Sequence, residues 1–255
     1  STHSASFIGR IEPSQIRHFR LDNCNASTHV QSIALPKDSD EQAKYIREAV
    51  KAYPEIYFAK LVVLGEGDSE QIIIPKLLEH FGEEIDANAI SVVPLGGKHV
   101  NHFWRLLESL KIPYVTLLDF DIDRNGGGFG RLRYAIEQIY SLKPNLTYLH
   151  SGILKNIPNW ADKKNPQDFS IKYMDNAEIN IVAELEKNDV FFSSPLDIDY
   201  SMICAFPDIF CEKDEKYGER GPIDGKEDEE DTDADLRKKA LIKAVLKKGN
   251  TGIRY

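Results

Sequence analysis

Cysteine is scarce in this sequence of 255 residues, which contains only Cys24, Cys204 and Cys211. Their number is odd and no two form a C-x-x-C pair, so both a disulfide framework and a zinc site are disfavoured. Long apolar runs are also missing, because none approaches the roughly 18 residues of a membrane span, and no signal peptide is recognisable. We therefore expect a cytoplasmic protein without membrane contact.

Basic residues are outnumbered by acidic ones, 32 to 41, which gives a net charge of −9. Much of the acidic excess lies in one run, Glu212–Asp235, which is typical of a solvated loop. The overall charge therefore argues neither for nor against nucleic acid as a partner. With 42% apolar residues the chain can bury a substantial core, as one large domain or two small ones.

Short apolar segments alternate with helical patterns along the middle of the chain. We predict strands at Leu61–Leu64, Ile90–Val93, Tyr114–Leu118 and Val190–Ser193, with helices between the first three. This alternation predicts parallel βαβ units, and so an α/β fold with a mostly parallel sheet of about four strands flanked by helices. A loop-rich, locally basic segment before the fourth strand predicts an inserted or appended smaller helical lobe.

Three further elements are less regular. Ile16–Leu21 and His29–Leu35 are expected to be short strands, and Glu178–Lys187 a helix. The helical pattern that ends at Phe81 contains Pro75, so we expect either a kink there or a later helix start.

Acidic side chains follow the predicted strands at the points where they end. They are Glu66 and Glu70 after the first strand, Asp119, Asp121 and Asp123 after the third, and Asp197 and Asp199 after the fourth. The carboxyl ends of parallel strands form one edge of a sheet, and alternate residues of an extended segment point the same way, so Glu66, Asp119 and Asp121 should converge. Clustered negative charges repel one another unless a cation shares the site, which predicts a metal centre.

Other interpretations of the acids after the third strand are open. The spacing of Asp121, Asp123, Asn125 and Gly126 matches the start of an EF-hand calcium loop, but Leu132 stands where that loop needs a bidentate Glu. An aspartyl phosphatase of the haloacid-dehalogenase kind would have Thr where this chain has Asp123. Asp119 or Asp121 could also cap the following helix or close a turn.

Two more motifs allow more than one interpretation. The glycine-rich segment Gly126–Gly130 is by default a flexible turn, and a phosphate cradle is the minority alternative. Asp197 and Asp199 are equally compatible with turn formation and with metal ligation.

A family resemblance rests on these motifs taken together. GEGDSE (Gly65–Glu70) after one strand and LLDFD (Leu117–Asp121) at the end of another resemble the Toprim domain of topoisomerases, primases, recombination proteins and certain nucleases. Three longer segments are similar to the OLD (overcoming lysogenisation defect) nucleases in particular, and the resemblance covers most of Thr2–Met202. These segments are THSASFIGRIEPSQIRHFRL (Thr2–Leu21), DIDRNGGGFGR (Asp121–Arg131) and FFSSPLDIDYSM (Phe191–Met202).

In that family an ATPase of the ABC kind precedes the Toprim domain, and His3 resembles the switch histidine at its end. Since the sequence also lacks an initiator Met, we expect a C-terminal fragment, with ATP bound only by the absent N-terminal domain. The resemblance implies that residues 1–59 end the ATPase and form a connecting helix. Residues 60–150 and 186–210 would be the two parts of the Toprim core, 151–185 an insertion or second lobe, and 211–255 an acidic loop and C-terminal helix.

The resemblance also implies roles for single residues. Two Mg²⁺ or Mn²⁺ ions would be bound by Glu66, Glu70, Asp119 and Asp121, with Asp197 and Asp199 completing the site. Glu66, Asp119, Asp121 and a lysine would be catalytic, and Lys248 is our choice for that lysine, with Lys247 as the second choice. Lys98, Arg124 and Arg131 would contact DNA phosphates.

The expected function is therefore metal-dependent cleavage or nicking of DNA by two-metal phosphodiester hydrolysis. By family analogy the full-length protein would be a homodimer and would work with a UvrD-like helicase in phage defence. A topoisomerase or primase site is an alternative, although no tyrosine is marked as a nucleophile. A non-catalytic Toprim-like module that binds DNA or protein is the alternative from another functional class.

Overall fold

The computed structural model describes most of the first 206 residues and little of the chain beyond them. The described residues are 1–2, 4–22, 26–33, 44, 47–48, 51–95, 100–122, 124–162, 164–173, 177–206, 213–214 and 218–219. Several predicted residues lie outside this set, namely His3, Lys98, Asp123, Lys247 and Lys248, together with most of the acidic run 212–235.

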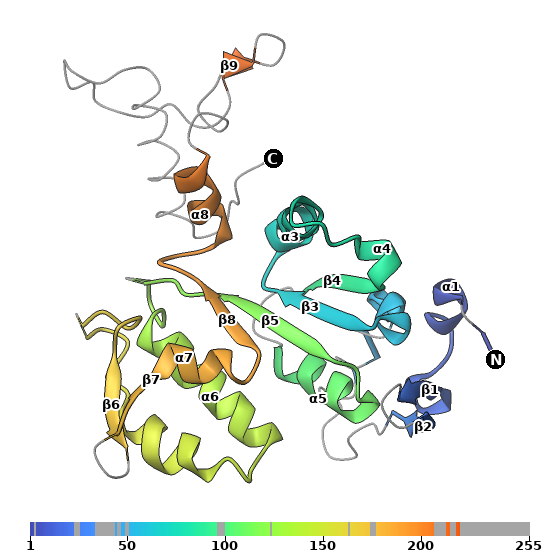
Figure 1. Cartoon of the computed structure of the whole chain (residues 1–255), viewed down its shortest axis with the longest axis horizontal. Helices are drawn as coiled ribbons and strands as arrows, with labels where there is room; N and C mark the ends of the chain where they lie inside the picture. Colours follow the sequence, from blue (N-terminus) through green and yellow to red (C-terminus); the bar gives the residue numbers. More distant parts are fainter. Residues whose placement is uncertain are drawn as a thin grey trace.

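A four-stranded parallel sheet forms the centre of the fold (Figure 1). Its strands are β3 (Leu61–Gly65), β4 (Ile90–Pro94), β5 (Tyr114–Asp119) and β8 (Val190–Ser193), in the order β4-β3-β5-β8. Largely apolar runs form these strands because both faces of the sheet are covered by helices. The predicted α/β class, the parallel sheet and its four strands are confirmed.

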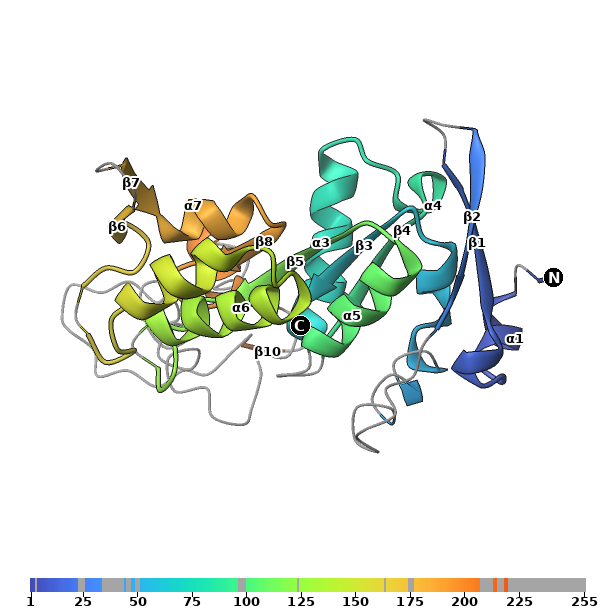
Figure 2. The ribbon, with the colours of Figure 1, turned by 90° about the horizontal axis from the view of Figure 1, so that it is seen from below.

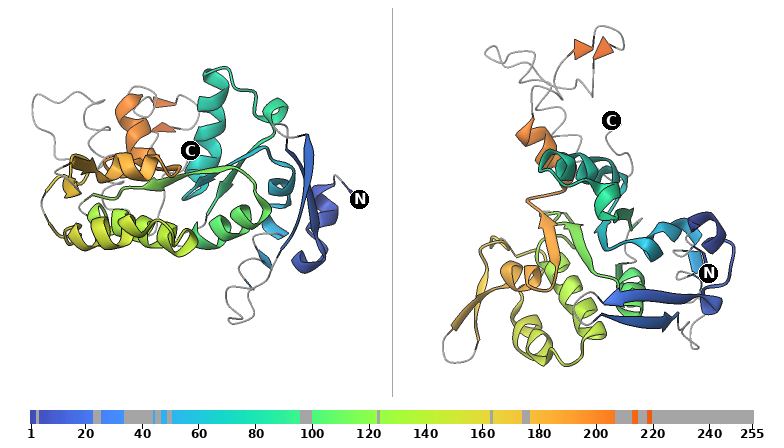
Figure 3. Two further views of the ribbon diagram at one scale, coloured as in Figure 1. Left: turned by 60° about the horizontal axis from the view of Figure 1, so that its bottom comes forward. Right: turned by 45° about the vertical axis from the view of Figure 1, so that its right-hand side comes forward.

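Helices cover the two faces of the sheet separately (Figures 2 and 3). On one face, α5 (Val100–Leu110) and α6 (Phe129–Leu142) pack against Val62, Leu64 and Leu118. On the other, α3 (Asp68–His80) and α8 (Ile198–Ala205) pack against Val63, and α4 (Ile85–Asn88) lies beside β4. The chain thus forms a three-layered α/β/α core.

One buried hydrogen bond links the layers. The indole Nε1 of Trp104, on α5, donates to the hydroxyl of Thr116 in β5 over 2.8 Å, and both residues are fully buried. The bond satisfies two polar groups that would otherwise be costly to bury.

Two smaller units lie at opposite ends of the core (Figure 2). At one end, the antiparallel strands β1 (Arg17–Asp22) and β2 (Ser27–Ser32) form a hairpin. At the other, a lobe between α6 and α7 (Ile181–Glu186) contains helical turns and the antiparallel pair β6 (Ser170–Tyr173) and β7 (Ala177–Asn180). The remaining short elements are α1 (Ala5–Ile8), η1 (Pro13–Gln15), η2 (Pro54–Phe58), η3 (Leu149–Ile153), η4 (Leu154–Asn156), β9 (Lys213–Asp214) and β10 (Gly218–Glu219).

A later start of α3, one of two alternatives at Pro75, is excluded, and the predicted start of α7 is wrong. Helix α3 begins at Asp68 and continues through Pro75, so it has no later start. The carbonyl of Gln71, which loses its donor there, belongs to an exposed residue where water can replace the missing N–H. Helix α7 begins at Ile181 because the Asn180 side chain accepts a hydrogen bond from the backbone of Ala183. Residues 178–180 extend β7 instead.

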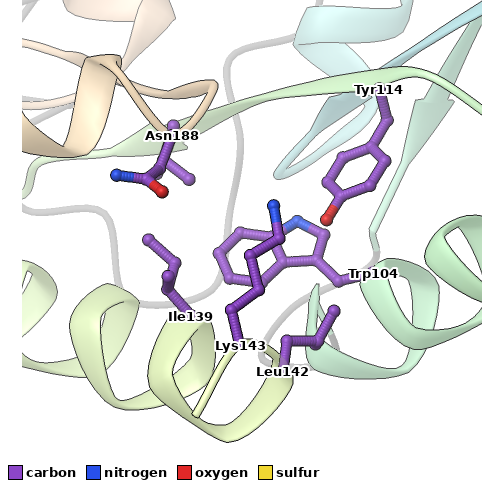
Figure 4. Close-up of a pocket in the computed structure, with 7 residues that line it drawn as sticks. Trp104, Tyr114, Ile139, Leu142, Lys143 and Asn188 are labelled. Carbon is purple, nitrogen blue, oxygen red and sulfur yellow. The ribbon is translucent and has the colours of Figure 1, made fainter. Parts of the chain in front are cut away.

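A narrow cavity lies near the amino ends of β5 and β8, between α5 and α6 (Figure 4). It is lined by Trp104, Tyr114, Ile139, Leu142, Lys143, Asn188 and Val190, and its volume of about 10 Å³ has room for about one water molecule. It is too small to be a substrate pocket and lies at the edge of the sheet opposite the acidic residues. Among the described residues, no helix combines the length and the apolarity that a membrane crossing requires.

Candidate metal centre

The segment after β5 is a tight reverse turn rather than an extended strand. Asp121 has a left-handed backbone with φ of 53°, and the N–H of Gly128 donates to the carbonyl of Phe120 over 2.7 Å. A Cβ at Gly127 would lie 1.7 Å from the carbonyl oxygen of Asp121, so only glycine fits. The glycine-rich segment therefore acts as a turn that holds Asp121, which supports the default interpretation of this motif.

The loop after β8 is hydrogen-bonded to the same segment. The carbonyl of Leu196 accepts hydrogen bonds from the backbone N–H groups of Phe120 and Asp121, both over 2.8 Å. Asp197 then caps α8, because its Oδ1 accepts from the N–H of Tyr200 over 2.8 Å. These bonds bring the amino end of α8 to the carboxyl end of β5.

Three aspartates converge as a result. One carboxylate oxygen from each of Asp119, Asp121 and Asp197 lies within 4.8 Å of the other two. Asp121 and Asp197 are buried and Asp119 is partly buried. Asp119 and Asp121 thus lie together, but not because they alternate along an extended strand. The chain reverses at Asp121, and this turn brings the two carboxylates together.

The first strand contributes two glutamates. Glu66 follows β3, and its Oε2 accepts a hydrogen bond from the backbone N–H of Asp119 over 3.0 Å, which ties the ends of β3 and β5 together. Glu70 is buried in the first turn of α3, and its Oε2 accepts from the N–H of Gly67 over 2.7 Å. A Cβ at Gly65 would lie 2.2 Å from the Cβ of Glu70, so the glycine lets α3 approach the sheet.

Asp199 lies deeper than the three converging aspartates. It is 1% exposed in the first turn of α8, and its charge is close enough to that of Glu70 to raise the pKa of Glu70. Burial is the largest cause of that raised pKa. Glu70 and Asp199 thus lie near each other in the first turns of the two helices that cover the same face of the sheet.

Two arginines pair with the aspartates and with Glu66. The guanidinium group of Arg131, in α6, donates to Glu66 Oε1 over 2.9 Å and to Oδ2 of Asp121. Arg124 donates to Oδ1 of Asp121 and to Asp197 Oδ2, the latter over 3.3 Å. Burial lowers the pKa of Arg131, but the two carboxylates outweigh it and leave the pKa raised. Both oxygens of Asp121 are thereby engaged by guanidinium groups.

Sequence reasoning missed these ion pairs. It assigned Arg124 and Arg131 to DNA phosphates, whereas in this structure both guanidinium groups point into the carboxylate cluster. Arg124 lies three residues after Asp121 on the same turn, a spacing that could have indicated the pair. The contact between Arg131 and Glu66 joins residues 65 positions apart, so no local sequence pattern predicts it.

Asp119 is the least compensated acid of the cluster. Its Oδ1 is buried without a hydrogen-bond partner in the part of the chain that the structure describes. Burial raises the pKa of Asp119 to about 9, and the charges of Glu66, Glu70, Asp121 and Asp197 add to that shift. A buried carboxylate oxygen without a donor is what a cation site requires, and an all-carboxylate set suits a hard ion such as Mg²⁺ or Mn²⁺. These residues fit a divalent metal.

Two of the alternative interpretations do not agree with this geometry. Helix α6 begins at Phe129 with Gly128 as its N-cap and no side-chain cap, so neither Asp119 nor Asp121 caps it. A strand precedes Asp121 and the next helix already includes Leu132, which is not the helix–loop–helix of an EF-hand. Asp197 has both of the roles considered for it, because it caps α8 and also belongs to the cluster of acids.

One protein family matches a part of the chain that contributes to this edge of the sheet. Residues 57–121 match the family described as Overcoming lysogenization defect protein-like, TOPRIM domain. The match covers only part of the chain and agrees with the resemblance predicted from the motifs. The matched range includes Glu66, Glu70, Asp119 and Asp121, while Asp197 and Asp199 lie beyond it.

One individual protein and two solved structures are similar to parts of this chain. Endonuclease GajA of Bacillus cereus (strain VD045) is 26% identical over 131 residues, which cover 51% of this chain and 22% of that protein. The chain therefore matches about a fifth of the length of this relative. Structures of the C-terminal region of the OLD protein of Xanthomonas campestris pv. campestris, phased with platinum and with mercury, have TM-scores of 0.41 and 0.40 and identities of 20% and 19%. They cover 61% and 60% of this chain and, in both cases, 60% of the other.

Proposed function

We propose that this chain carries the active site of a metal-dependent DNA endonuclease. The observation that carries the proposal is the convergence of Asp119, Asp121 and Asp197 within 4.8 Å at the carboxyl edge of the sheet. The match of residues 57–121 to an OLD-like TOPRIM domain supports it, as does the likeness to a protein named as an endonuclease.

In this proposal, two Mg²⁺ or Mn²⁺ ions are held by Glu66, Asp119 and Asp121, with Glu70, Asp197 and Asp199 completing the set. Divalent ions bound in such a site would lower the pKa of a bound water molecule. They would also stabilise the negative charge on the attacking and leaving oxygens of a phosphodiester. Lys248 remains the predicted catalytic lysine and Lys98 a predicted phosphate contact. Both lie outside the described residues.

Hydrogen bonds within the chain orient the carboxylates of the site in the absence of substrate. Glu66 is oriented by the N–H of Asp119, and Asp197 by the N–H of Tyr200. Asp121 is held by the turn that folds over Gly127. Each of these groups sits on a regular element or on a hydrogen-bonded turn, and such support is what keeps a site in its productive geometry.

The substrate follows from the chemistry of the site. A phosphodiester is anionic, and a carboxylate cluster alone would repel it, so cleavage requires the bound cations. DNA is the proposed substrate, with phosphate contacts from Arg124, Arg131 and the basic lobe. A homodimer, a UvrD-like helicase partner and a role in phage defence remain predictions from the family resemblance.

Plasmid cleavage tests the proposal directly. Supercoiled plasmid is incubated with the 255-residue chain and Mg²⁺, Mn²⁺ or Ca²⁺, with wild type compared with Asp119→Ala. We expect nicked or linear product from the wild type with Mg²⁺ or Mn²⁺, and none from the variant. Circular dichroism must show that the variant is folded.

The exposed Asp86→Ala variant, in α4, is the matched control for loss of one acid and should cleave like the wild type. Cleavage by Asp119→Ala at the wild-type rate would refute the assignment of the site. If the wild type binds plasmid and cuts it with none of the three ions, the non-catalytic module is the better interpretation.

A further inference from the structure

Two arginines engage the carboxylate oxygens of Asp121 that a metal ion would need. Asp121 offers two carboxylate oxygens, and each is engaged by a guanidinium group, Oδ1 by Arg124 and Oδ2 by Arg131. A metal ion that uses Asp121 needs one of these same oxygens. The arginines and the metal therefore compete for one carboxylate.

We propose that Arg131, assisted by Arg124, is an exchangeable counter-ion of the metal centre, which a divalent ion must displace from Asp121 in order to bind. This inference rests on the proposed function, because it takes Asp121 as a metal ligand. Arg131 acts through Asp121 and Glu66 and is a positioning residue. Its guanidinium group sets how tightly the site binds metal and keeps the acids together before metal arrives.

The burial and the geometry of Arg131 support this role. Its side chain is 19% exposed, and it bridges carboxylates that follow two different strands, Glu66 after β3 and Asp121 after β5. Solvent thus screens these pairs less than it screens a surface ion pair. Lysine could not replace it in full, since a guanidinium group presents several donors in a fixed plane and an ammonium group is a point charge.

Competition and plain structural support predict opposite changes in metal affinity. If Arg131 only holds the ligands in place, then removing it loosens them and weakens metal binding. If Arg131 competes, removing it frees an oxygen of Asp121 and removes the repulsion between two cations, so binding tightens. A charge-assisted hydrogen bond corresponds to about a tenfold change in the binding constant.

The test is isothermal titration with Mn²⁺ in the absence of nucleic acid, with thermal unfolding in EDTA as the second readout. We expect Arg131→Gln to bind Mn²⁺ about tenfold more tightly than wild type and to unfold at a lower temperature without metal. Arg131→Lys should fall between the two in both measurements. The stabilisation by saturating Mn²⁺ should be larger in Arg131→Gln than in wild type.

Arg133→Gln is the matched control. Arg133 lies on the same helix but donates to backbone carbonyls, those of Leu154 over 3.3 Å and Ile157 over 2.9 Å. Its loss should lower the unfolding temperature and leave the affinity for Mn²⁺ unchanged.

The outcomes separate the two hypotheses. Equal or weaker Mn²⁺ binding by folded Arg131→Gln overturns the counter-ion role and leaves the proposed function standing. Absence of Mn²⁺ binding in both the wild type and the variant overturns the metal centre itself, and with it the counter-ion role.

Discussion

The protonation of Asp119 should make the metal-free protein less stable as the pH rises. Burial and four neighbouring carboxylates raise the pKa of Asp119 from 3.8 to about 9, so the folded state keeps the proton where the unfolded chain releases it. The resulting stability is fully present below about pH 4 and is lost progressively as the pH rises towards 9. Asp119→Asn removes this loss, because asparagine resembles the neutral carboxyl group in shape and does not ionise.

The size of the effect follows from the shift in pKa. Each pH unit between the two pKa values changes the free energy of unfolding by up to about 1.4 kcal/mol. Between pH 5 and pH 8 the upper limit is about 4 kcal/mol, and solvent access to the partly buried Asp119 reduces it to about 2 kcal/mol. We therefore expect the stability difference in favour of Asp119→Asn to grow by about 2 to 4 kcal/mol between pH 5 and pH 8.

Urea unfolding in EDTA at pH 5, 6, 7 and 8 measures this difference. Exposed Asp86→Asn is the control for removal of one acid and should follow the wild-type curve. Parallel curves for wild type and Asp119→Asn across this range would refute the reasoning, since they would mean that Asp119 ionises alike in the folded and unfolded states. The same variant should lose Mn²⁺ binding, so the change that stabilises the metal-free fold removes its metal site.

Three further substitutions test other parts of the structure. Trp104→Phe leaves the buried hydroxyl of Thr116 without its donor and should cost about 1–3 kcal/mol in urea unfolding. Gly127→Ala would place a Cβ against the carbonyl of Asp121 and should abolish Mn²⁺ binding in calorimetry. Burial lowers the pKa of His18, although its backbone hydrogen bonds act in the opposite direction. The neutral form of His18 therefore contributes to the free energy of unfolding above about pH 6.5, and this contribution is lost as the pH falls below that value. In His18→Gln, the slope of the unfolding free energy between pH 5 and 6.5 should become flatter.

The four strands of the parallel sheet were predictable because their signal in the sequence is local. Runs such as Leu61–Leu64 and Tyr114–Leu118 are apolar on both faces, and that pattern belongs to strands covered by helices on two sides. The meeting of Glu66 with the acids after β5 was also predictable, since parallel strands end at one edge. The start of α7 was not, because the choice between strand and helix at residues 178–180 depends on pairing with β6 and on the cap formed by Asn180.

The internal geometry of the site depends on contacts between distant parts of the chain. Asp121 follows β5 in a left-handed conformation, which no alternation of residues predicts, and the loop after β8 holds it there through the carbonyl of Leu196. Arg131 was recognised as a cation near the site, but its direction is set by Glu66, which lies 65 positions away in the sequence. A sequence pattern can identify the members of such a cluster, while the pairing within it comes from the packing of the sheet and its helices.

The charge balance of the metal-free site explains why two events should accompany metal entry. Glu66, Asp121 and Asp197 are paired with Arg124 and Arg131, and the pKa of Asp119 keeps its carboxyl group neutral near pH 7. With Asp119 neutral, three carboxylates face two guanidinium groups, so one negative charge is left uncompensated for an ion that carries two positive charges. The ion must therefore release the proton of Asp119 and displace a guanidinium group from Asp121. Since the first step depends on pH and the second on Arg131, a rise in pH and the loss of Arg131 should each tighten metal binding by separate routes.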